Sequence, residues 1–152
     1  MSIKILSIGK KHEDWVVDGI QRYSKRLKKP FDLQWQLLPH SSRQGQAART
    51  EESERLIAKL SSRDHVILLD ERGTMLSSPG LAKHLQQCFN QAKPVVLVVG
   101  GAYGVTEELR KRANLQWSLS KLVFPHQLVR LALTEQIYRA QDIVGGGSYH
   151  HS

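Results

Sequence analysis

Four short apolar stretches in this chain have the length and composition of β-strands. They cover Ile3 to Ile8, Asp32 to Leu38, His65 to Asp70 and Val95 to Val99. The second alternates apolar and polar positions, which indicates one buried face. The other three are nearly continuous in valine, isoleucine and leucine, which is typical of strands covered on both faces.

Polar segments with apolar residues at helical spacing separate these strands. They predict helices over Glu13 to Lys29, Ala47 to Leu60, a stretch that starts after Ser77 or Ser78, and His126 to Val144. The first of these has acidic residues in its first turn and basic residues in its last, which complements the helix dipole. Alternating strands and helices predict a single α/β domain over residues 1–152, with a mostly parallel sheet flanked by helices.

Ligands of such sheets bind beyond the carboxyl ends of the strands. Three of the predicted ends are Leu69-Asp70-Glu71, Gly100-Gly101 and the segment Ser118 to Phe124. The last two belong to a run from Val95 to Arg130 in which a strand enters a glycine turn, a short helix follows, and a small-residue loop then precedes a second helix. We therefore expect these ends to form the edges of one pocket.

Several kinds of site are disfavoured at this pocket. The turn Gly100-Gly101-Ala102-Tyr103-Gly104 lacks the G-x-G-x-x-G spacing of dinucleotide sites and the lysine of a P-loop. No serine lies in a nucleophile elbow, no Cys/His cluster has zinc spacing, and the single cysteine, Cys88, lies on the apolar stripe of a predicted helix. The remaining interpretation is a backbone-lined pocket without metal or nucleophile, which positions reagents that are already reactive.

Charge points to a polyanionic partner. The 152 residues include 22 lysines and arginines and 14 acidic residues, which gives a net charge of +8. Such an excess favours nucleic acid through phosphate neutralisation. One cysteine allows no internal disulfide, the segment Met1 to Gly9 is too short for a secretory signal, and no apolar run has membrane-spanning length. We expect a cytoplasmic protein that does not contact membranes.

Two arginines of the last predicted helix have different surroundings. Arg139 follows Glu135 by four positions, which predicts an ion pair, although a substrate contact stays open. Arg130 has no such partner and follows Pro125-His126 by one turn, so we expect it to face a substrate.

The carboxyl terminus, Gly145 to Ser152, combines a glycine hinge with Tyr149, His150 and His151. Stacking and hydrogen bonding to a nucleobase need this mixture, whereas a frayed end is the alternative interpretation. The polar segment His40 to Gln46 is likewise either a solvated connector or a basic lid over a phosphate-bearing substrate.

Taken in order, the motifs of this chain resemble those of the RlmH family, small methyltransferases of the SPOUT superfamily. The resemblance covers the whole length. It rests on Ile5-Leu6-Ser7-Ile8-Gly9-Lys10, Gly73-Thr74-Met75-Leu76-Ser77-Ser78, Val99-Gly100-Gly101 with Gly104, Ser118-Leu119-Ser120-Lys121, Phe124-Pro125-His126, Leu128-Val129-Arg130, Glu135-Gln136 with Tyr138-Arg139-Ala140, and Tyr149-His150.

The resemblance implies methylation of N3 of a pseudouridine in 23S ribosomal RNA, on assembled ribosomes and without a metal. It also implies a carboxyl-terminal trefoil knot, a homodimer and S-adenosylmethionine as methyl donor. The implied donor contacts are Leu69, Gly100, Gly101, Leu119, Ser120, Lys121, Leu122, Val123 and Phe124. Methylation of another RNA such as tRNA, or a non-catalytic ribosome-binding factor, are the alternatives.

Site roles follow from the same resemblance. His150 would be the base or would orient it, Tyr149 would stack on the nucleobase, and Arg130 would complete the catalytic group. His126, Arg130 and Arg139 would hold the RNA, and the tail would enter the partner subunit's pocket. Family members commonly end with a basic residue after the Tyr-His pair, whereas this chain ends His151-Ser152. The tail of this chain therefore lacks the basic residue that would attract RNA phosphates.

Overall fold

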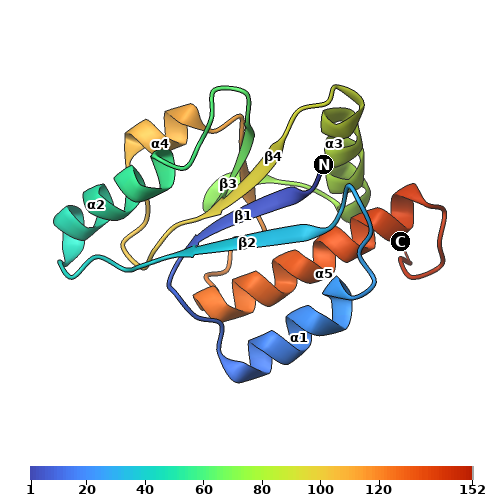
Figure 1. Ribbon diagram of the computed structural model, residues 1–152, viewed down its shortest axis with the longest axis horizontal. Helices are drawn as coiled ribbons and strands as arrows, with labels where there is room; N and C mark the ends of the chain where they lie inside the picture. The colour runs from blue at the N-terminus through green and yellow to red at the C-terminus, as the bar shows by residue number, and fades with distance from the viewer. Residues whose placement is uncertain (152) are drawn as a thin grey trace.

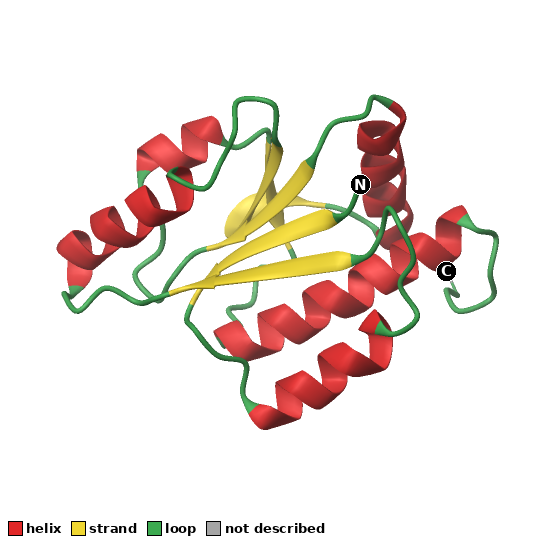
Figure 2. Cartoon of the chain, in the orientation of Figure 1, coloured by secondary structure: helices red, strands yellow, loops and turns green. Residues whose placement is uncertain are grey.

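The computed structural model describes residues 1–151, which form one five-stranded sheet with helices on both faces (Figures 1 and 2). Ser152, and with it the last position of the predicted tail, lies outside the described residues. The predicted α/β class is confirmed. The elements in chain order are β1 (Ile3–Ile8), α1 (Asp14–Ser24), β2 (Leu33–Leu38), α2 (Gly45–Ile57), β3 (His65–Met75), α3 (Ser78–Asn90), β4 (Val95–Val99), α4 (Glu107–Arg112), β5 (Leu115–Ser118) and α5 (His126–Val144).

The strands lie in the order β2-β1-β4-β3-β5, and every neighbouring pair is parallel. β1, β4 and β3 are the inner strands, which explains why their sequences are nearly continuous in apolar residues. Because all strands run the same way, their carboxyl ends meet at one edge of the sheet. The segments that follow β3, β4 and β5 therefore start side by side.

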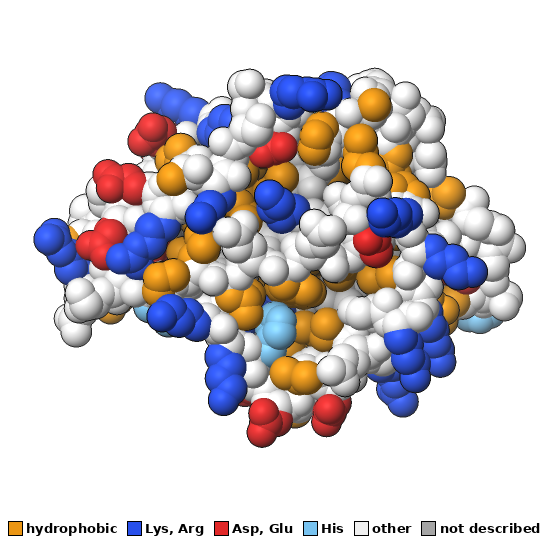
Figure 3. All heavy atoms as spheres, viewed as in Figure 1, with side chains coloured by type: hydrophobic (Ala, Val, Ile, Leu, Met, Phe, Trp, Pro, Cys, Tyr) orange, Lys and Arg blue, Asp and Glu red, His pale blue; other side chains and the backbone are white. Residues whose placement is uncertain are grey.

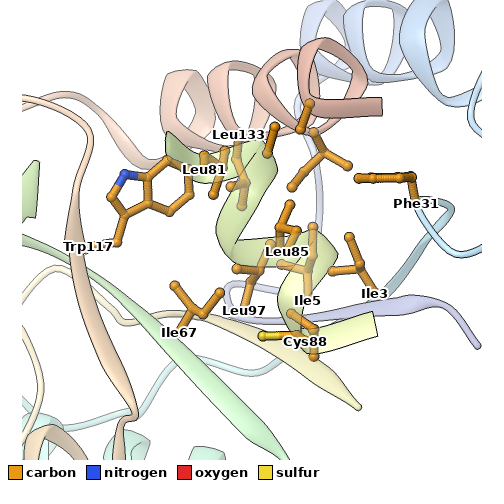
Figure 4. Close-up of a cluster of buried hydrophobic side chains, with 14 of the residues drawn as sticks. Ile3, Ile5, Phe31, Ile67, Leu81, Leu85, Cys88, Leu97, Trp117 and Leu133 are labelled. Atoms are coloured by element: carbon orange, nitrogen blue, oxygen red, sulfur yellow. The ribbon is translucent and has the colours of Figure 1, made fainter. Parts of the chain in front are cut away.

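Alternate positions of each inner strand supply two separate cores, as the strand period of two requires. Ile5 and Leu97 face the side covered by α1, α3 and α5, where they pack with Leu85 and Leu133 (Figures 1 and 4). The other side, under α2 and α4, has a smaller core. That second cluster comprises Leu6, Ile8, Leu38, Leu56, Val66, Leu68, Val96, Val98, Val105 and Leu109.

The end of α1 and the length of β3 differ from those expected from the sequence. α1 ends at Ser24 rather than near Lys29, because the segment after it is basic with few apolar residues and turns toward Pro30. α4 and β5 have six and four residues. They agree with the short helix expected after the glycine turn and with the strand expected to end near Ser118, although elements this short carry too little periodicity to fix their bounds. No helix within residues 1–151 is both long and apolar enough to span a membrane.

β3 is longer than expected and continues to Met75 after an irregularity. Leu69 and Thr74 both pair with Trp117 of β5, so residues 70–73 leave the ladder as a bulge. Gly73 returns the chain to the sheet against the backbone of β5: a Cβ built there would lie 2.6 Å from the carbonyl carbon of Gln116 and 2.9 Å from the nitrogen of Trp117. The position therefore requires glycine.

We expect Gly73→Ala to lower the free energy of unfolding by about 1–3 kcal/mol, the usual cost of forcing extra volume into a packed site. Urea unfolding followed by tryptophan fluorescence measures the loss. Gly145→Ala is the matched control, since a Cβ at Gly145 would meet the carbonyl oxygen of Gln141 at an ordinary 3.4 Å. Equal stability of the two variants would contradict the packing argument.

Candidate functional site

A cavity of about 820 Å³ opens at the carboxyl edge of β3, β4 and β5. This volume is in the range of small-molecule sites. Its walls come from three segments: the bulge of β3, the glycine turn (residues 100–104) and the pocket loop (residues 119–125). The three strand ends predicted to form one pocket do lie around one cavity.

Most residues expected to contact a methyl donor line this cavity. They are Leu69, Gly100, Gly101, Leu119, Ser120, Leu122, Val123 and Phe124. Lys121 is the exception, because its side chain is exposed and does not belong to the cavity wall. A charged side chain in water is the arrangement that costs least at the tip of a loop.

The glycine turn has two positions at which no side chain fits. A Cβ at Gly100 would lie 2.5 Å from Cγ1 of Val105, and one at Gly101 would collide with the carboxylate of Glu52. Gly104 has a φ of +80°, in the left-handed region, and its N–H donates to the Gly101 carbonyl at 3.1 Å. Bare backbone therefore forms this side of the cavity.

Serine side chains shape the pocket loop. Ser118 Oγ donates to the carbonyl of Ser120 at 2.8 Å, and Ser120 Oγ accepts from the N–H of Leu122 at 3.0 Å. Leu122 and Val123 lie at the tip of the loop with 70% and 77% of their surface exposed. The loop thus presents two adjacent apolar side chains to solvent beside the cavity.

An ion pair that was not anticipated from the sequence closes another wall. Arg110 Nε lies 2.9 Å from Asp70 Oδ2, and the same guanidinium donates to the carbonyl of Val105 at 3.2 Å. This ties the end of β3 to the segment after β4. Arg49 also lines the cavity and donates to the carbonyl of Tyr103 at 2.8 Å. Nothing in the spacing of these arginines marks them, because their partners are backbone atoms or residues distant in sequence.

Arg130 does not face the cavity, which corrects the expectation that it faces a substrate. Only 1% of its surface is exposed. Its guanidinium donates to the carbonyls of Ile8 and Gly9, both at 3.0 Å, to Ser7 Oγ at 3.1 Å and to the carbonyl of Lys11 at 3.0 Å. The physical reason is that β1 ends here and leaves carbonyls without strand partners, which the buried cation satisfies.

His126 does line the cavity, one turn before Arg130. Burial lowers the pKa of His126, and the neighbouring charges of Arg130 and His40 lower it further, while Glu52 and the backbone of Gly101 act in the opposite direction. The imidazole is therefore neutral at pH 7. A neutral imidazole can accept a hydrogen bond or a proton.

Glu52 supports the glycine turn from behind. The residue is 3% exposed, and its Oε2 accepts the N–H of Ser41 at 2.9 Å. Its Oε1 is buried against Gly101 and has no hydrogen-bond partner within residues 1–151. The side chain lies on α2, so this helix and the polar segment before it are fixed to the cavity wall.

The remaining predicted residues lie at the other end of α5. Arg139 NH2 lies 2.7 Å from Glu135 Oε1, which confirms the predicted ion pair. The guanidinium also lies over the ring of Tyr149, 4.7 Å from its centroid, and NH1 lies 3.1 Å from His150 Nδ1. Burial raises the pKa of Tyr149 to about 12. The tail (residues 145–151) therefore folds back onto its own helix.

Cavity and tail are separate within one chain. α5 begins at His126 beside the cavity and ends 18 residues later at Val144, a length of about 27 Å at 1.5 Å per residue. The carboxyl terminus lies at the far end of this helix in Figure 1. The structure thus groups His126 with the expected donor contacts, and groups Arg139, Tyr149 and His150 elsewhere.

Removal of the Arg130 guanidinium should destabilise the chain strongly. We expect Arg130→Met to lower the free energy of unfolding by about 2–4 kcal/mol, because buried carbonyls at the end of β1 lose their donors. Arg63→Met, at an exposed position, is the control and should change stability by less than about 0.5 kcal/mol. Chemical denaturation of both variants measures the difference; similar midpoints would mean that Arg130 is not structural.

Comparison with known proteins gives consistent matches. Residues 1–150 match the model of a family described as "Predicted SPOUT methyltransferase". Proteins named Ribosomal RNA large subunit methyltransferase H are similar over their full length. The one from Geobacter metallireducens is 41% identical, with both chains covered completely. Those from Geobacter sulfurreducens and Hahella chejuensis are each 39% identical, with at least 99% of both chains covered.

A solved structure supports the fold independently of close sequence similarity. A probable methylase family protein from Haemophilus influenzae Rd KW20 superposes with a TM-score of 0.52 at 12% identity. The match covers 95% of this chain and 66% of that protein. Together with the match over residues 1–150 and the full-length relatives, this establishes that the chain belongs to the SPOUT methyltransferase family.

Proposed function

We propose that this protein transfers the methyl group of S-adenosylmethionine to N3 of a pseudouridine in 23S ribosomal RNA, on assembled ribosomes in the cytoplasm. The observation that carries the proposal is the cavity at the carboxyl edge of β3, β4 and β5. Its walls are the same glycine turn and pocket loop on which the resemblance to the RlmH family rests. The names of the full-length relatives support an RNA of the large ribosomal subunit as substrate.

The cavity fits a donor of this size and polarity. Gly100 and Gly101 present bare backbone to the cavity, since a side chain at either position would collide with Val105 or Glu52, and the pocket loop offers backbone groups beside apolar side chains. These segments would hold S-adenosylmethionine, which supplies a methyl group on a positively charged sulfur. No metal takes part in this proposal. We further infer that the two segments belong to a trefoil knot, as the resemblance implies.

On the protein side, the reaction needs a group that receives the N3 proton of the target base. Geometry decides which side chain can act, since a base must reach hydrogen-bond distance. His126 is available at the cavity as a neutral imidazole, where it would bind a carbonyl of the base or a phosphate. His150 is the proposed base or its orienting group, and Tyr149 would stack on the ring. With Arg130 buried, its proposed role is to hold His126 in place.

The tail would act in the cavity of a second subunit. Tyr149 and His150 contact Glu135 and Arg139 of their own α5. These positions lie nine and thirteen residues from His126, or about 14 to 20 Å along the helix, so the folded-back tail does not reach the cavity of its own chain. Leu122 and Val123 at the cavity, together with the half-exposed Trp15 of α1, offer apolar surface for a partner. A homodimer that pairs each tail with the opposite cavity would cover this surface and complete both sites.

Electrostatic attraction would bring the protein to its RNA. Lysine and arginine side chains are spread over the face drawn in Figure 3, with fewer carboxylates between them. With a net charge of +8, phosphate neutralisation supplies affinity that does not depend on base sequence. Arg139, which lies beside Tyr149 and His150, would contribute to this binding from the partner subunit.

The most direct test combines donor binding with a comparison of RNA substrates. We expect calorimetry to detect S-adenosylmethionine binding, and radiolabelled methyl transfer to occur on intact large subunits or ribosomes, with little on free ribosomal RNA or on tRNA. Mass spectrometry of nuclease fragments would identify the modified base. Transfer to tRNA instead would indicate the alternative RNA substrate, and absence of donor binding would indicate a non-catalytic ribosome-binding factor.

Complementation between two inactive variants tests the role of the tail. One variant ends after Gly147, and the other carries Ala102→Trp, which places an indole at the cavity and should prevent donor binding. Each alone should lose methyl transfer by at least tenfold. The mixed dimer should regain activity, because one subunit's intact cavity then meets the other subunit's intact tail.

The two variants are co-expressed with different affinity tags, and the mixed dimer is purified on both tags. Mixing the separately purified variants would yield mixed dimers only as far as their subunits exchange. Calorimetry on each parent controls for donor binding, which the truncated chain should retain unless the tail also touches the donor. If mixed dimers stay inactive while wild-type dimers prepared in the same way are active, the tail does not act in the partner's cavity. If truncation leaves the rate unchanged, the tail has no role in the reaction.

A further inference from the structure

A second group of chemically active side chains lies at the edge of the sheet opposite the cavity. His65 is the first residue of β3, and His84 and Cys88 lie one turn apart on α3. Their donor atoms all lie within 4.8 Å of one another. The spacing of these residues along the sequence gave no sign of the cluster, because the fold brings together side chains that are 19 and 23 positions apart.

The backbone holds the three side chains in place. His84 and Cys88 are four residues apart, so they project from the same face of α3. Leu81 and Leu85 anchor that helix in the large core, and Cys88 lies at the margin of the same cluster (Figure 4). The side chains of His65 and His84 meet with their Nε2 atoms 2.9 Å apart and their rings tilted by 48°.

The distances are close to those of a coordination sphere. Tetrahedral zinc, with bonds of about 2.0 Å to nitrogen and 2.3 Å to sulfur, separates its donor atoms by roughly 3.3 to 3.8 Å. Donors that already lie within 4.8 Å reach this arrangement through small side-chain rotations. Both imidazoles are half-buried and Cys88 is 4% exposed, so the group is sheltered yet reachable from solvent.

Burial acts differently on the three side chains: it favours the neutral imidazoles that a metal needs and opposes the thiolate. Burial lowers the pKa of His65 and His84, and the charges of His84, Lys93 and Arg112 lower that of His65 further. Neutral imidazole is the form that binds metals. Burial raises the pKa of the Cys88 thiol, while Lys93 acts in the opposite direction; a coordinated thiol loses its proton outright.

The charged groups around the cluster restrict which ion it takes. Lys93 and Arg112 lie close enough to affect His65, and their charges oppose a hard cation that relies on electrostatic attraction. Arg112 is committed elsewhere, since it donates to the carbonyls of Ser61 and Asp64. Two imidazoles and a thiolate instead favour a soft or borderline ion, to which they bind with covalent character.

We propose that His65, His84 and Cys88 bind a transition-metal ion of the zinc and copper(I) group, with a water molecule or a small external ligand in any further position. The ion joins the amino end of β3 to α3. It lies outside the donor cavity, so its contribution is to stability: a ligand bound only by the folded chain raises the unfolding temperature. The inference does not depend on the proposed methyl transfer.

Cobalt(II) is the probe, and the full-length chain stripped with a chelator is the protein. Cys88 is the only cysteine, so a thiolate-to-cobalt charge-transfer band reports this site alone. We expect one equivalent of cobalt to give that band together with the visible bands of a tetrahedral ion. Zinc should displace cobalt and raise the unfolding temperature. A parallel titration with copper(I) under anaerobic conditions decides which of the two ions binds more tightly.

Four variants make the test specific. Cys88→Ala should remove the charge-transfer band, and His65→Gln and His84→Gln should each weaken cobalt binding at least tenfold. His151→Gln is the control, because the tail histidines are another place where metal can bind, and it should leave the band intact. Circular dichroism confirms that each variant is folded.

Alkylation of Cys88 by iodoacetamide gives a second readout that needs no variant to be stable. Zinc should slow the reaction in the wild-type chain at least tenfold and should have no effect in His84→Gln. A folded wild-type chain without the charge-transfer band, or cobalt binding that His151→Gln removes and Cys88→Ala leaves unchanged, would overturn the site. The histidines would then form only a hydrogen bond between β3 and α3.

Discussion

The buried guanidinium of Arg130 fixes the geometry on which the site depends. Where β1 ends, the last carbonyls of the strand and of the segment after it have no strand partner. The guanidinium donates hydrogen bonds to the carbonyls of Ile8, Gly9 and Lys11 in its place. Buried carbonyls without donors are costly, so this contact holds the first turn of α5 against the sheet edge. His126 and the pocket loop, which precede Arg130 directly, are thereby set beside the glycine turn.

A second consequence concerns the far end of the same helix. α5 packs against both α1 and α3, so once its first turn is fixed, the direction of its last turn is fixed as well. The tail begins there, and the contacts of Tyr149 with Arg139 and Glu135 keep it close to the helix. One rigid helix thus separates two groups that the proposed reaction needs together. The proposed homodimer would resolve that conflict if its twofold axis set the two α5 helices antiparallel, since each tail would then lie beside the partner's cavity.

The strands, the long helices and the position of the cavity could be predicted from the sequence, because they follow from local periodicity. Apolar runs such as Val95 to Val99 predicted inner strands. The rule that ligands of parallel sheets bind at the carboxyl ends of the strands then predicted the position of the cavity. Contacts between residues that are far apart in the sequence could not be predicted. The burial of Arg130 depends on where β1 ends relative to α5, and the Asp70–Arg110 ion pair spans a bulge and a helix too short to show a period.

The carboxyl and amino edges of the sheet carry different kinds of chemical groups. At the carboxyl edge, strand ends leave backbone groups that must be satisfied, and glycine turns and loops supply room for a ligand. At the amino edge, His65 at the start of β3 lies against α3, and the packing of that helix on the sheet brings His65 and His84 into contact. The carboxyl edge therefore carries the backbone-lined cavity, and the amino edge carries a cluster of side chains. A metal joining β3 to α3 would stiffen the strand that, at its other end, carries the bulge lining the cavity.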